Sequence, residues 1–404
     1  MAGLVFISFI LTFIFSFTQQ IISFQLPSQF DNIPFIHLAY INQPIPVKRF
    51  KRLAKGVNIY DWFGDNEGRL KTKAERLKYF TTLDAIRLQR MGITNIRLSV
   101  ADFILFDEAK PRILKNPNVL AEIDQAINLL NRQGISVTFS LRGLKNTMIQ
   151  LYKNPQFESK YLIFWNSLAR HLRKFSPEML FLEILNEPSL IQGVMESGDG
   201  SWSNYEKALS LANKKWSGVQ EKLLTAIRRQ APRHTVVLSG DAWSSIPGLI
   251  GIKPLRDKNV VYTIHIYDPL AFTHQGAIWV GEQFKQIKGL TYPAIARNCE
   301  EVKMKVSEQF KYAVNEYCQK KWNRSQQEEN IKQALNWANK YGVKLWVGET
   351  GVYPDFAPPG SAEIYLRDIR LILEKYQVGW SIWEYVNWLK RFESPSMRKA
   401  LGLS

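Results

Sequence analysis

Eight short runs rich in β-branched and aromatic residues recur along the chain from residue 53, and longer stretches with helical periodicity separate them. Runs of this kind that alternate with helices predict βα units and a parallel sheet. Eight such units favour a closed (β/α)8 TIM barrel, of the α/β class, over an open sheet. The expected strands span residues 53–63, 93–100, 135–143, 179–188, 234–240, 260–268, 343–351 and 378–388.

The stretches between these runs have the sequence features of helices. Three of them, "RLKYFTTLDAIRLQRMG", "LAEIDQAINLLNRQG" and "QEENIKQALNWANKYG", are amphipathic and end in Gly, a common residue just after a helix. We find no internal repeat beyond the βα unit and no low-complexity linker, so we expect one barrel domain over residues 53–404. Two connections, 189–204 and 268 to about 322, are long enough to shape a binding site.

The chain begins with the uncharged apolar stretch "MAGLVFISFILTFIFSF". Its length suits the apolar core of a signal peptide, so residues 1–24 are predicted to be a signal peptide or an N-terminal anchor, followed by an extension over 25–52. The expected location is secreted or periplasmic. No basic residue precedes the apolar stretch and no small-residue cleavage site follows it, so a membrane-anchored domain outside the cytoplasm remains the alternative.

The formal net charge of +17 favours anionic partners without choosing among them. Basic residues are scattered through amphipathic segments and form no recognised nucleic-acid module, so we expect no nucleic-acid partner. The basic cluster "KRFKR", residues 48–52, is expected to be solvated surface. Cys299 and Cys318 are the only cysteines, too few for a zinc site, and they either pair or remain buried thiols.

Polar or aromatic side chains stand near the ends of six of the eight expected strands. The stretch "FLEILNEPS", residues 181–189, shows the pattern, because a buried strand there gives way to Asn, Glu and Pro. A single polar residue at a strand end is common, because turns favour such residues. In a barrel, however, the C-terminal strand ends meet at one mouth, where catalytic groups lie. The residues concerned are Arg97, Arg142, Glu187, His265, Tyr267, Glu349 and Trp383.

Glu187 and Glu349 would face each other across that mouth. A carboxylate pair about 5 to 5.5 Å apart suits retaining glycoside hydrolysis, in which one attacks the anomeric carbon and the other protonates the leaving oxygen. Repulsion between like charges would help to keep the acid protonated. The alternatives are a salt bridge with Arg97 or a divalent metal site. Metal is disfavoured, because no second His or Asp stands at ligand spacing from either Glu.

The motifs "FLEILNEP", "LWVGETG", "RLSV", "HIYDP" and "WSIWEY", in this order and spacing, resemble glycoside hydrolase family 5, the cellulase family of the clan A retaining glycosidases. The resemblance covers nearly the whole chain from about residue 53. It implies that Glu187 is the general acid/base and Glu349 the nucleophile. The segment "YDPLAFTHQGAIW", residues 267–279, resembles a loop of bacterial members that act on β-glucans.

The resemblance also implies roles for neighbouring residues. Asn186 would hold the 2-hydroxyl of the sugar being cleaved, Arg97 would support the nucleophile, and Tyr267 would donate a hydrogen bond to it. His265 would line the site near the acid/base, and Trp383 would form the floor under that sugar. We further expect two loop residues, Trp202 and Trp279, to stack sugars in neighbouring subsites.

One position departs from the family pattern. Many members carry His near the end of the third strand, in a sequence resembling "LHG", where this chain has "LRG" with Arg142. Arginine is always charged and is a forked donor. It could reach a sugar hydroxyl, bind an acidic group on the substrate, or pair with a neighbouring carboxylate.

The expected protein is a monomeric retaining endo-β-glycosidase without a cofactor, and its partner is a polysaccharide, foremost a β-1,4-glucan. The alternatives are a β-mannanase or a hydrolase of a mixed or acidic exopolysaccharide. A transglycosylase would share every residue, and a barrel that only binds carbohydrate would lack one of the two glutamates. Membrane contact is expected only if the N-terminal segment is uncleaved.

Overall fold

The computed structural model describes residues 43–64 and 72–404. The predicted signal peptide or anchor, residues 1–24, and the extension as far as residue 42 lie outside the described residues. Within the described ranges, no helix is both long enough and apolar enough to cross a membrane.

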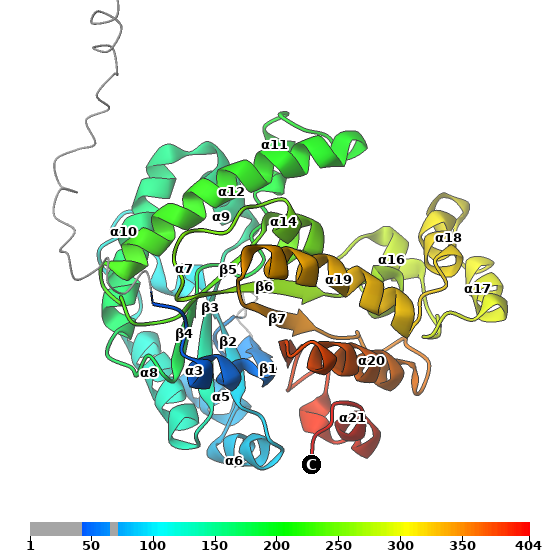
Figure 1. Cartoon of the computed structure of the whole chain (residues 1–404), viewed down its shortest axis with the longest axis horizontal. Coiled ribbons are helices and arrows are strands. Elements are labelled where there is room, and N and C mark those ends of the chain that lie inside the picture. Colours follow the sequence, from blue (N-terminus) through cyan, green and yellow to red (C-terminus); the bar gives the residue numbers. More distant parts are fainter. Residues whose placement is uncertain (1–42, 65–71) are drawn as a thin grey trace, which may run out of the picture.

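Eight parallel strands form a closed barrel in sequence order, and β8 pairs with β1 (Figure 1). The predicted TIM barrel is therefore confirmed. Each strand is buried along nearly its whole length, as expected where helices cover the outside and side chains fill the inside. The strands are β1 (Lys55–Tyr60), β2 (Asn95–Ala101), β3 (Ser136–Arg142), β4 (Leu180–Glu183), β5 (Val236–Ser239), β6 (Val260–Ile266), β7 (Leu345–Thr350) and β8 (Gly379–Ile382).

Two strands, β4 and β8, fall furthest short of their predicted ends. The run expected over 179–188 pairs as β4 only to Glu183, and the run expected over 378–388 pairs as β8 only to Ile382. After β4, the backbone N–H of Asn186 donates to the carbonyl of Leu141 at 2.7 Å, and Glu187 takes a positive φ of 46°. A strand cannot continue through that left-handed backbone.

The helices of the outer layer follow the strands around the barrel (Figure 1). The three predicted glycine ends are confirmed: Gly92, Gly134 and Gly342 all have positive φ after a helix. The longer helices are α5 (Lys73–Tyr79), α6 (Thr82–Arg90), α8 (Pro117–Arg132), α9 (Lys145–Lys153), α10 (Pro155–Leu172), α12 (Tyr205–Arg228), α17 (Ala296–Lys303), α18 (Lys311–Gln319), α19 (Arg324–Tyr341) and α20 (Ser361–Lys375).

Shorter helical segments lie mainly in the loops. They are α3 (Val47–Phe50), η1 (Lys51–Leu53), α4 (Asp61–Gly64), α7 (Asp102–Leu105), α11 (Ile191–Glu196), η2 (Trp202–Asn204), α13 (Asp241–Ser244), α14 (Ile246–Ile250), α15 (Leu270–Thr273), α16 (Glu282–Gln286), η3 (Glu308–Phe310), η4 (Lys390–Phe392) and α21 (Pro395–Ala400).

The segment before β1 packs against the barrel. Ile45 and Leu53 join an apolar cluster with residues of β4, β5, β6 and β7. The prediction that residues 48–52 are solvated surface is wrong for Arg49, which is 6% exposed. Its guanidinium forms an ion pair with Glu178 and donates to the carbonyl of Arg233. The basic cluster therefore helps to hold this segment on the barrel.

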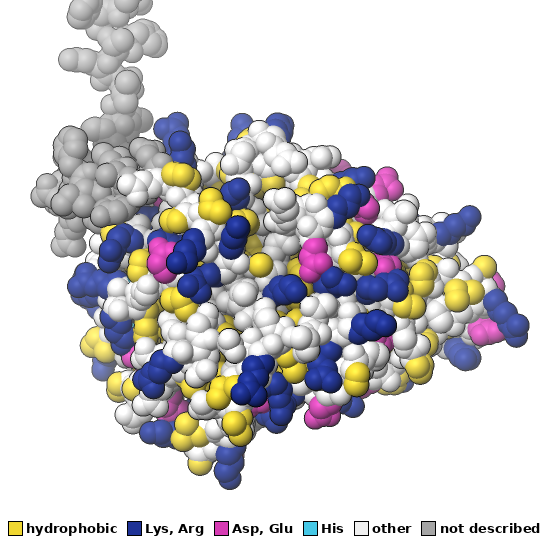
Figure 2. All heavy atoms as spheres, turned by 60° about the horizontal axis from the view of Figure 1, so that its bottom comes forward, with side chains coloured by type: hydrophobic (Ala, Val, Ile, Leu, Met, Phe, Trp, Pro, Cys, Tyr) yellow, Lys and Arg dark blue, Asp and Glu magenta, His cyan; other side chains and the backbone are white. Residues whose placement is uncertain are grey.

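The long connection after β6 carries α15 to α18, and α16, α17 and α18 extend away from the barrel (Figure 1). A disulfide between Cys299 and Cys318 joins α17 to α18. The two cysteines therefore pair and are not buried free thiols. Figure 2 shows that Lys and Arg side chains are spread over the whole of the face in view rather than gathered in one strip.

Candidate active site

Glu187 lies in the loop after β4, and its backbone conformation is held by neighbours on both sides. Trp243 donates its backbone N–H to the carbonyl of Pro188 at 3.0 Å. The buried carboxylate of Asp241 accepts the backbone N–H groups of Leu190 and Ile191 at 2.7 and 3.0 Å. A left-handed non-glycine residue persists only where its surroundings hold it, and such strain concentrates at functional sites. The loop after β5 thus fixes the position of Glu187.

Arg97 is the buried centre of the site. Its Nε and Nη2 donate to the two carboxylate oxygens of Glu183, each at 2.7 Å, in a bidentate pair. Nη1 donates to Glu349 Oε1 at 2.5 Å and to Asn58 Oδ1 at 3.0 Å, and Nη2 also reaches Asn186 Oδ1 at 2.6 Å. The salt bridge weighed for Arg97 therefore exists, and it holds Glu349, one member of the carboxylate pair.

Glu349, near the end of β7, is held at both carboxylate oxygens. Arg97 binds Oε1, and the hydroxyl of Tyr267 donates to Oε2 at 2.8 Å. Burial raises the pKa of Glu349, and the charge of Arg97 and the Tyr267 hydrogen bond oppose that rise. Because both donors favour the charged form, Glu349 is the carboxylate suited to remain ionised.

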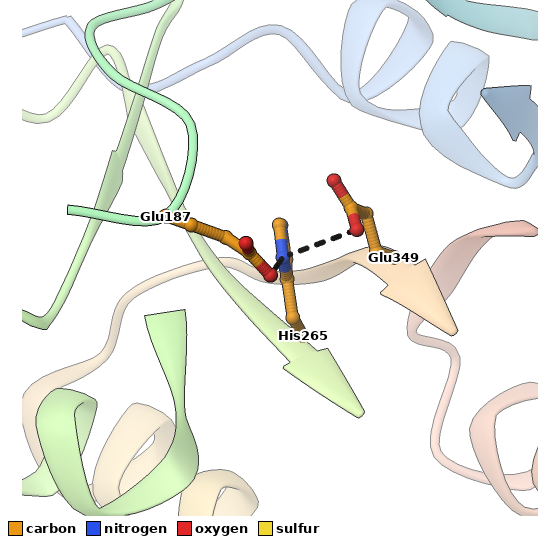
Figure 3. A group of neighbouring side chains, drawn as sticks. All are labelled: Glu187, His265 and Glu349. Atoms are coloured by element: carbon orange, nitrogen blue, oxygen red, sulfur yellow. Dashed lines mark hydrogen bonds and ion pairs between the residues drawn. The ribbon is translucent and has the colours of Figure 1, made fainter. Parts of the chain in front are cut away.

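His265 lies between the two glutamates, and Figure 3 shows its ring beside both carboxyl groups. Its Nδ1 is 2.9 Å from Glu187 Oε1 and 3.6 Å from Glu349 Oε2. Burial lowers the pKa of His265 to about 4, so the ring is neutral at pH 7. Since Nε2 has no partner among the described residues, the proton belongs on Nδ1, facing the carboxylates.

A glycine lets the His265 ring lie against β7. The β6–β7 register shifts between Ile264 and His265, which sets His265 opposite Glu349. A Cβ on Gly348 would lie 2.7 Å from Thr263 Oγ1 and 3.1 Å from His265 Nε2. Only a residue without a side chain allows that approach, so Gly348 helps to bring the imidazole to the carboxylate pair.

The two glutamates lie close together. One carboxylate oxygen of each and one ring nitrogen of His265 all lie within 4.8 Å of one another. The sequence disfavoured a metal site because no second His or Asp stands at ligand spacing along the chain, but His265, from a different strand, lies beside both glutamates in space. Retaining glycosidases have carboxyl groups only about 5 to 5.5 Å apart, which leaves no room for an attacking water, and the close approach of Glu187 and Glu349 is compatible with that class.

Glu187 is suited to carry a proton. Burial raises its pKa to about 7, the charges of Arg97 and Arg142 lower it, and the charge of Glu183 raises it. We expected repulsion from Glu349 to help to raise this pKa, whereas the largest cause is burial and the charge that raises it is that of Glu183. A carboxyl group with a pKa near neutrality can both donate and accept a proton under ordinary conditions.

Ring contacts link a series of aromatic side chains that begins at the C-terminal ends of β1 and β8. The ring of Trp383 lies 5.2 Å from that of Tyr60 and 6.5 Å from that of Trp388. The ring of Trp388 also lies 6.3 Å from that of Trp279, and Trp279 is 56% exposed. Flat exposed rings of this kind suit the apolar faces of sugars.

Trp202 stands apart from this series. It is 63% exposed, and its one ring contact within the described part of the chain is with Tyr205 at 6.2 Å. The structure therefore brings Trp279 and Trp383 together and leaves Trp202 on a separate loop. Both loops belong to the C-terminal side of the barrel, since they follow β4 and β6.

Arg142 ends β3 and forms no ion pair with any described carboxylate. Its Nη1 donates to the carbonyl of Gly64 at 3.1 Å, and its guanidinium carbon lies 4.9 Å from the centre of the Tyr60 ring. The nearby carboxylate of Asp102 bonds instead to Thr147 Oγ1 at 2.8 Å. Of the three possibilities for Arg142, pairing with a neighbouring carboxylate is therefore not found.

A family model described as cellulase, glycosyl hydrolase family 5, matches residues 71–387. The chain belongs to glycosyl hydrolase family 5. It is 23% identical over 382 residues to Endoglucanase 3 of Fibrobacter succinogenes, a match that covers 90% of this chain and 54% of that protein. The chain thus spans about half the length of this relative.

Two solved protein structures illustrate the similarity of fold. Endoglucanase Cel5A of Thermotoga maritima has a TM-score of 0.68 at 21% identity, covering 88% of this chain and 99% of that one. It has been solved with cellobiose and with mannotriose. The cellulose synthase subunit Z of Clostridioides difficile has a TM-score of 0.63 at 19% identity, covering 86% and 99%. At these identities the likeness supports the fold.

Within this family 5 barrel, sequence reasoning missed three residues that build the site. Glu183 and Asn58 are almost fully buried partners of Arg97. Both stood inside apolar runs, where a polar side chain needs a partner, and that signal could have found them. Trp243 is 38% exposed and supports the Glu187 loop in a run of left-handed residues, for which the sequence carries no clear signal.

Proposed function

We propose that the protein is a retaining endo-β-glycosidase that hydrolyses β-1,4-glucan. The observation that carries the proposal is the close pair Glu187 and Glu349, with donors on Glu349 and a partly buried Glu187 whose pKa is raised to about 7. Support for a glucan comes from the endoglucanases among its relatives. The mannotriose complex of Cel5A supports β-mannan as a second candidate substrate.

The reaction proceeds in two steps. Glu349 attacks the anomeric carbon while Glu187 gives its proton to the glycosidic oxygen, so the leaving chain departs as an alcohol. A covalent glycosyl–enzyme ester remains. Glu187, now ionised, takes a proton from water, and the resulting nucleophile displaces Glu349 from the same carbon. The carbonyl oxygen of Asn186 binds Arg97, so its amide NH2 group is the part that can donate to a sugar hydroxyl.

The stereochemistry of the product tests the mechanism directly. Two displacements at one carbon restore the β configuration, so proton NMR in the first minutes of hydrolysis should show the β-anomer before mutarotation. A screen of β-glucans, mannans, xylan and acidic polysaccharides, with the products sized, identifies the substrate beforehand. An initial α-anomer would mean an inverting enzyme and would overturn the proposal.

The aromatic residues on the loops predict a dependence on chain length. Trp279→Ala should raise KM for long oligosaccharides several-fold and leave short ones nearly unchanged, because it removes a stacking surface away from the bond being cleaved. Trp202→Ala should act in the same direction but less, since its ring is held by one neighbour and that of Trp279 by several. Equal losses on short and long chains would indicate damage to the fold instead.

We also propose that the barrel acts outside the cytoplasm. The Cys299–Cys318 disulfide supports this, because disulfides persist in oxidising compartments and are rare in the cytosol. A secreted or periplasmic location and an anchored one both fit that chemistry. Fractionation of cells expressing the full chain, followed by protease treatment of intact cells, distinguishes them.

A further inference from the structure

Arg142 is a charged group at the mouth of the barrel that the two-step reaction does not use. A guanidinium has five N–H donors. Within the described residues, one of these donors forms a hydrogen bond, from Nη1 to the carbonyl of Gly64. The side chain is partly buried and forms no ion pair with any described residue, so its remaining donors are available to a ligand.

The position of Arg142 connects it with the bound sugar chain. Its guanidinium lies over the ring of Tyr60, and Tyr60 contacts Trp383, the expected floor under the reacting sugar. The same charge also reaches the acid/base, because Arg142 lowers the pKa of Glu187. A substituent on a sugar near Trp383 would therefore meet a fixed cation within electrostatic range of the reaction.

The contacts on two sides hold the guanidinium in place before substrate binds. The Gly64 carbonyl fixes one nitrogen and the Tyr60 ring covers one face, so little side-chain freedom remains to be lost. A planar fork held in this way matches the two oxygens of a carboxylate or a phosphate, and it binds either more strongly than a neutral hydroxyl.

We propose that Arg142 is a specificity-determining residue that binds an anionic substituent of the glucan chain, so the preferred substrate is a charged β-1,4-glucan rather than plain cellulose. This inference rests on the proposed glucanase function and narrows its substrate class. The shared chemistry is an anion with two or more oxygens, and either a uronic acid carboxylate or a phosphate ester supplies it.

The test compares three cello-oligosaccharides of equal length: neutral, with some C6 carbons oxidised to carboxylate, and with some C6 hydroxyls phosphorylated. The wild-type protein should show a kcat/KM about 10-fold or more higher on at least one charged chain. Arg142→Gln should lose that preference, measured as the ratio of kcat/KM on charged and neutral chains, and Arg142→Lys should retain part of it. The charged chain that is preferred identifies the source of the anion.

A matched control separates local recognition from the general attraction of a chain with net charge +17. Lys214, an exposed residue of α12, lines a pocket of about 610 Å³ on the outer helices with Lys153 and Lys222. Lys214→Gln removes the same charge and should leave the preference unchanged. Equal effects of Lys214→Gln and Arg142→Gln, or no preference for either charged chain in the wild type, would overturn the inference.

The pH profile gives a second readout. Because the charge of Arg142 lowers the pKa of Glu187, an anion bound to Arg142 should raise that pKa and keep the acid protonated to higher pH. The alkaline limb of kcat, near pH 7, should therefore move upward for the charged substrate in the wild type but not in Arg142→Gln. A wild type that cleaves no β-1,4-glucan would refute the proposed function itself, whereas cleavage without preference refutes only the inference.

Discussion

Glu349→Ala should lower kcat by roughly 10⁴-fold or more while the barrel remains folded, because no other group can form the covalent intermediate. Removing a buried carboxyl group whose pKa is raised by burial relieves a desolvation cost, so thermal stability should be equal to or above that of the wild type. Initial rates on the substrate found by screening, with circular dichroism melts beside them, measure both effects.

Azide distinguishes the two glutamates. In Glu349→Ala, azide enters the space that the carboxylate leaves and attacks the anomeric carbon once, so the product is an α-glycosyl azide. In Glu187→Ala, Glu349 still forms the intermediate, and azide then yields the β-glycosyl azide from an aryl glycoside with a good leaving group. The opposite pairing of products would exchange the two roles, and ordinary hydrolysis by either variant would refute the assignment.

Arg97→Met should destabilise the protein by about 3 to 5 kcal/mol, since it leaves buried carboxylates without their cation. Glu349, whose pKa burial already raises, would have to take up a proton in the folded state, whereas the same carboxyl group stays ionised in the unfolded chain above about pH 5. The loss should therefore be larger at pH 8 than at pH 5, where protonation costs less. Urea unfolding at both pH values measures the difference.

Two further variants control this experiment. Arg97→Lys keeps the charge but not the bidentate geometry and should recover part of the stability. The double variant Arg97→Met with Glu183→Gln removes one stranded carboxylate, so it should be more stable than Arg97→Met alone at pH 8. An equal loss at pH 5 and pH 8, unaffected by Glu183→Gln, would mean that Arg97 acts through packing and not through charge.

The barrel was predictable because its signals are local and repeated. Alternating runs, glycine ends and turn residues follow from short-range geometry, and the topology of a barrel then brings distant strand ends together. The same topology allows the sequence alone to single out Arg97, Glu187, His265, Tyr267 and Glu349. The structure places all five in one network.

What could not be predicted depends on distances across the barrel. Glu183 lies only four residues before Glu187, yet its partner is 86 residues away on another strand. The early end of β4 results from a hydrogen bond to Leu141 and the left-handed Glu187, neither of which has a sequence pattern. Arg49 similarly forms an ion pair with Glu178, which lies 129 residues away in the sequence. The basic cluster 48–52, predicted to be solvated surface, therefore contains a buried arginine.

The Arg97 network also makes the two halves of the chain depend on each other. Arg97 and Glu183 come from β2 and β4, and Glu187, the proposed acid/base, comes from the loop after β4. Glu349 comes from β7, and Tyr267 directly follows β6. A fragment that ends between β4 and β6 would carry a proton donor with no nucleophile to act beside it. During refolding, the return of hydrolysis should consequently report the moment at which β6 and β7 join the first half of the barrel, later than any signal from helix content.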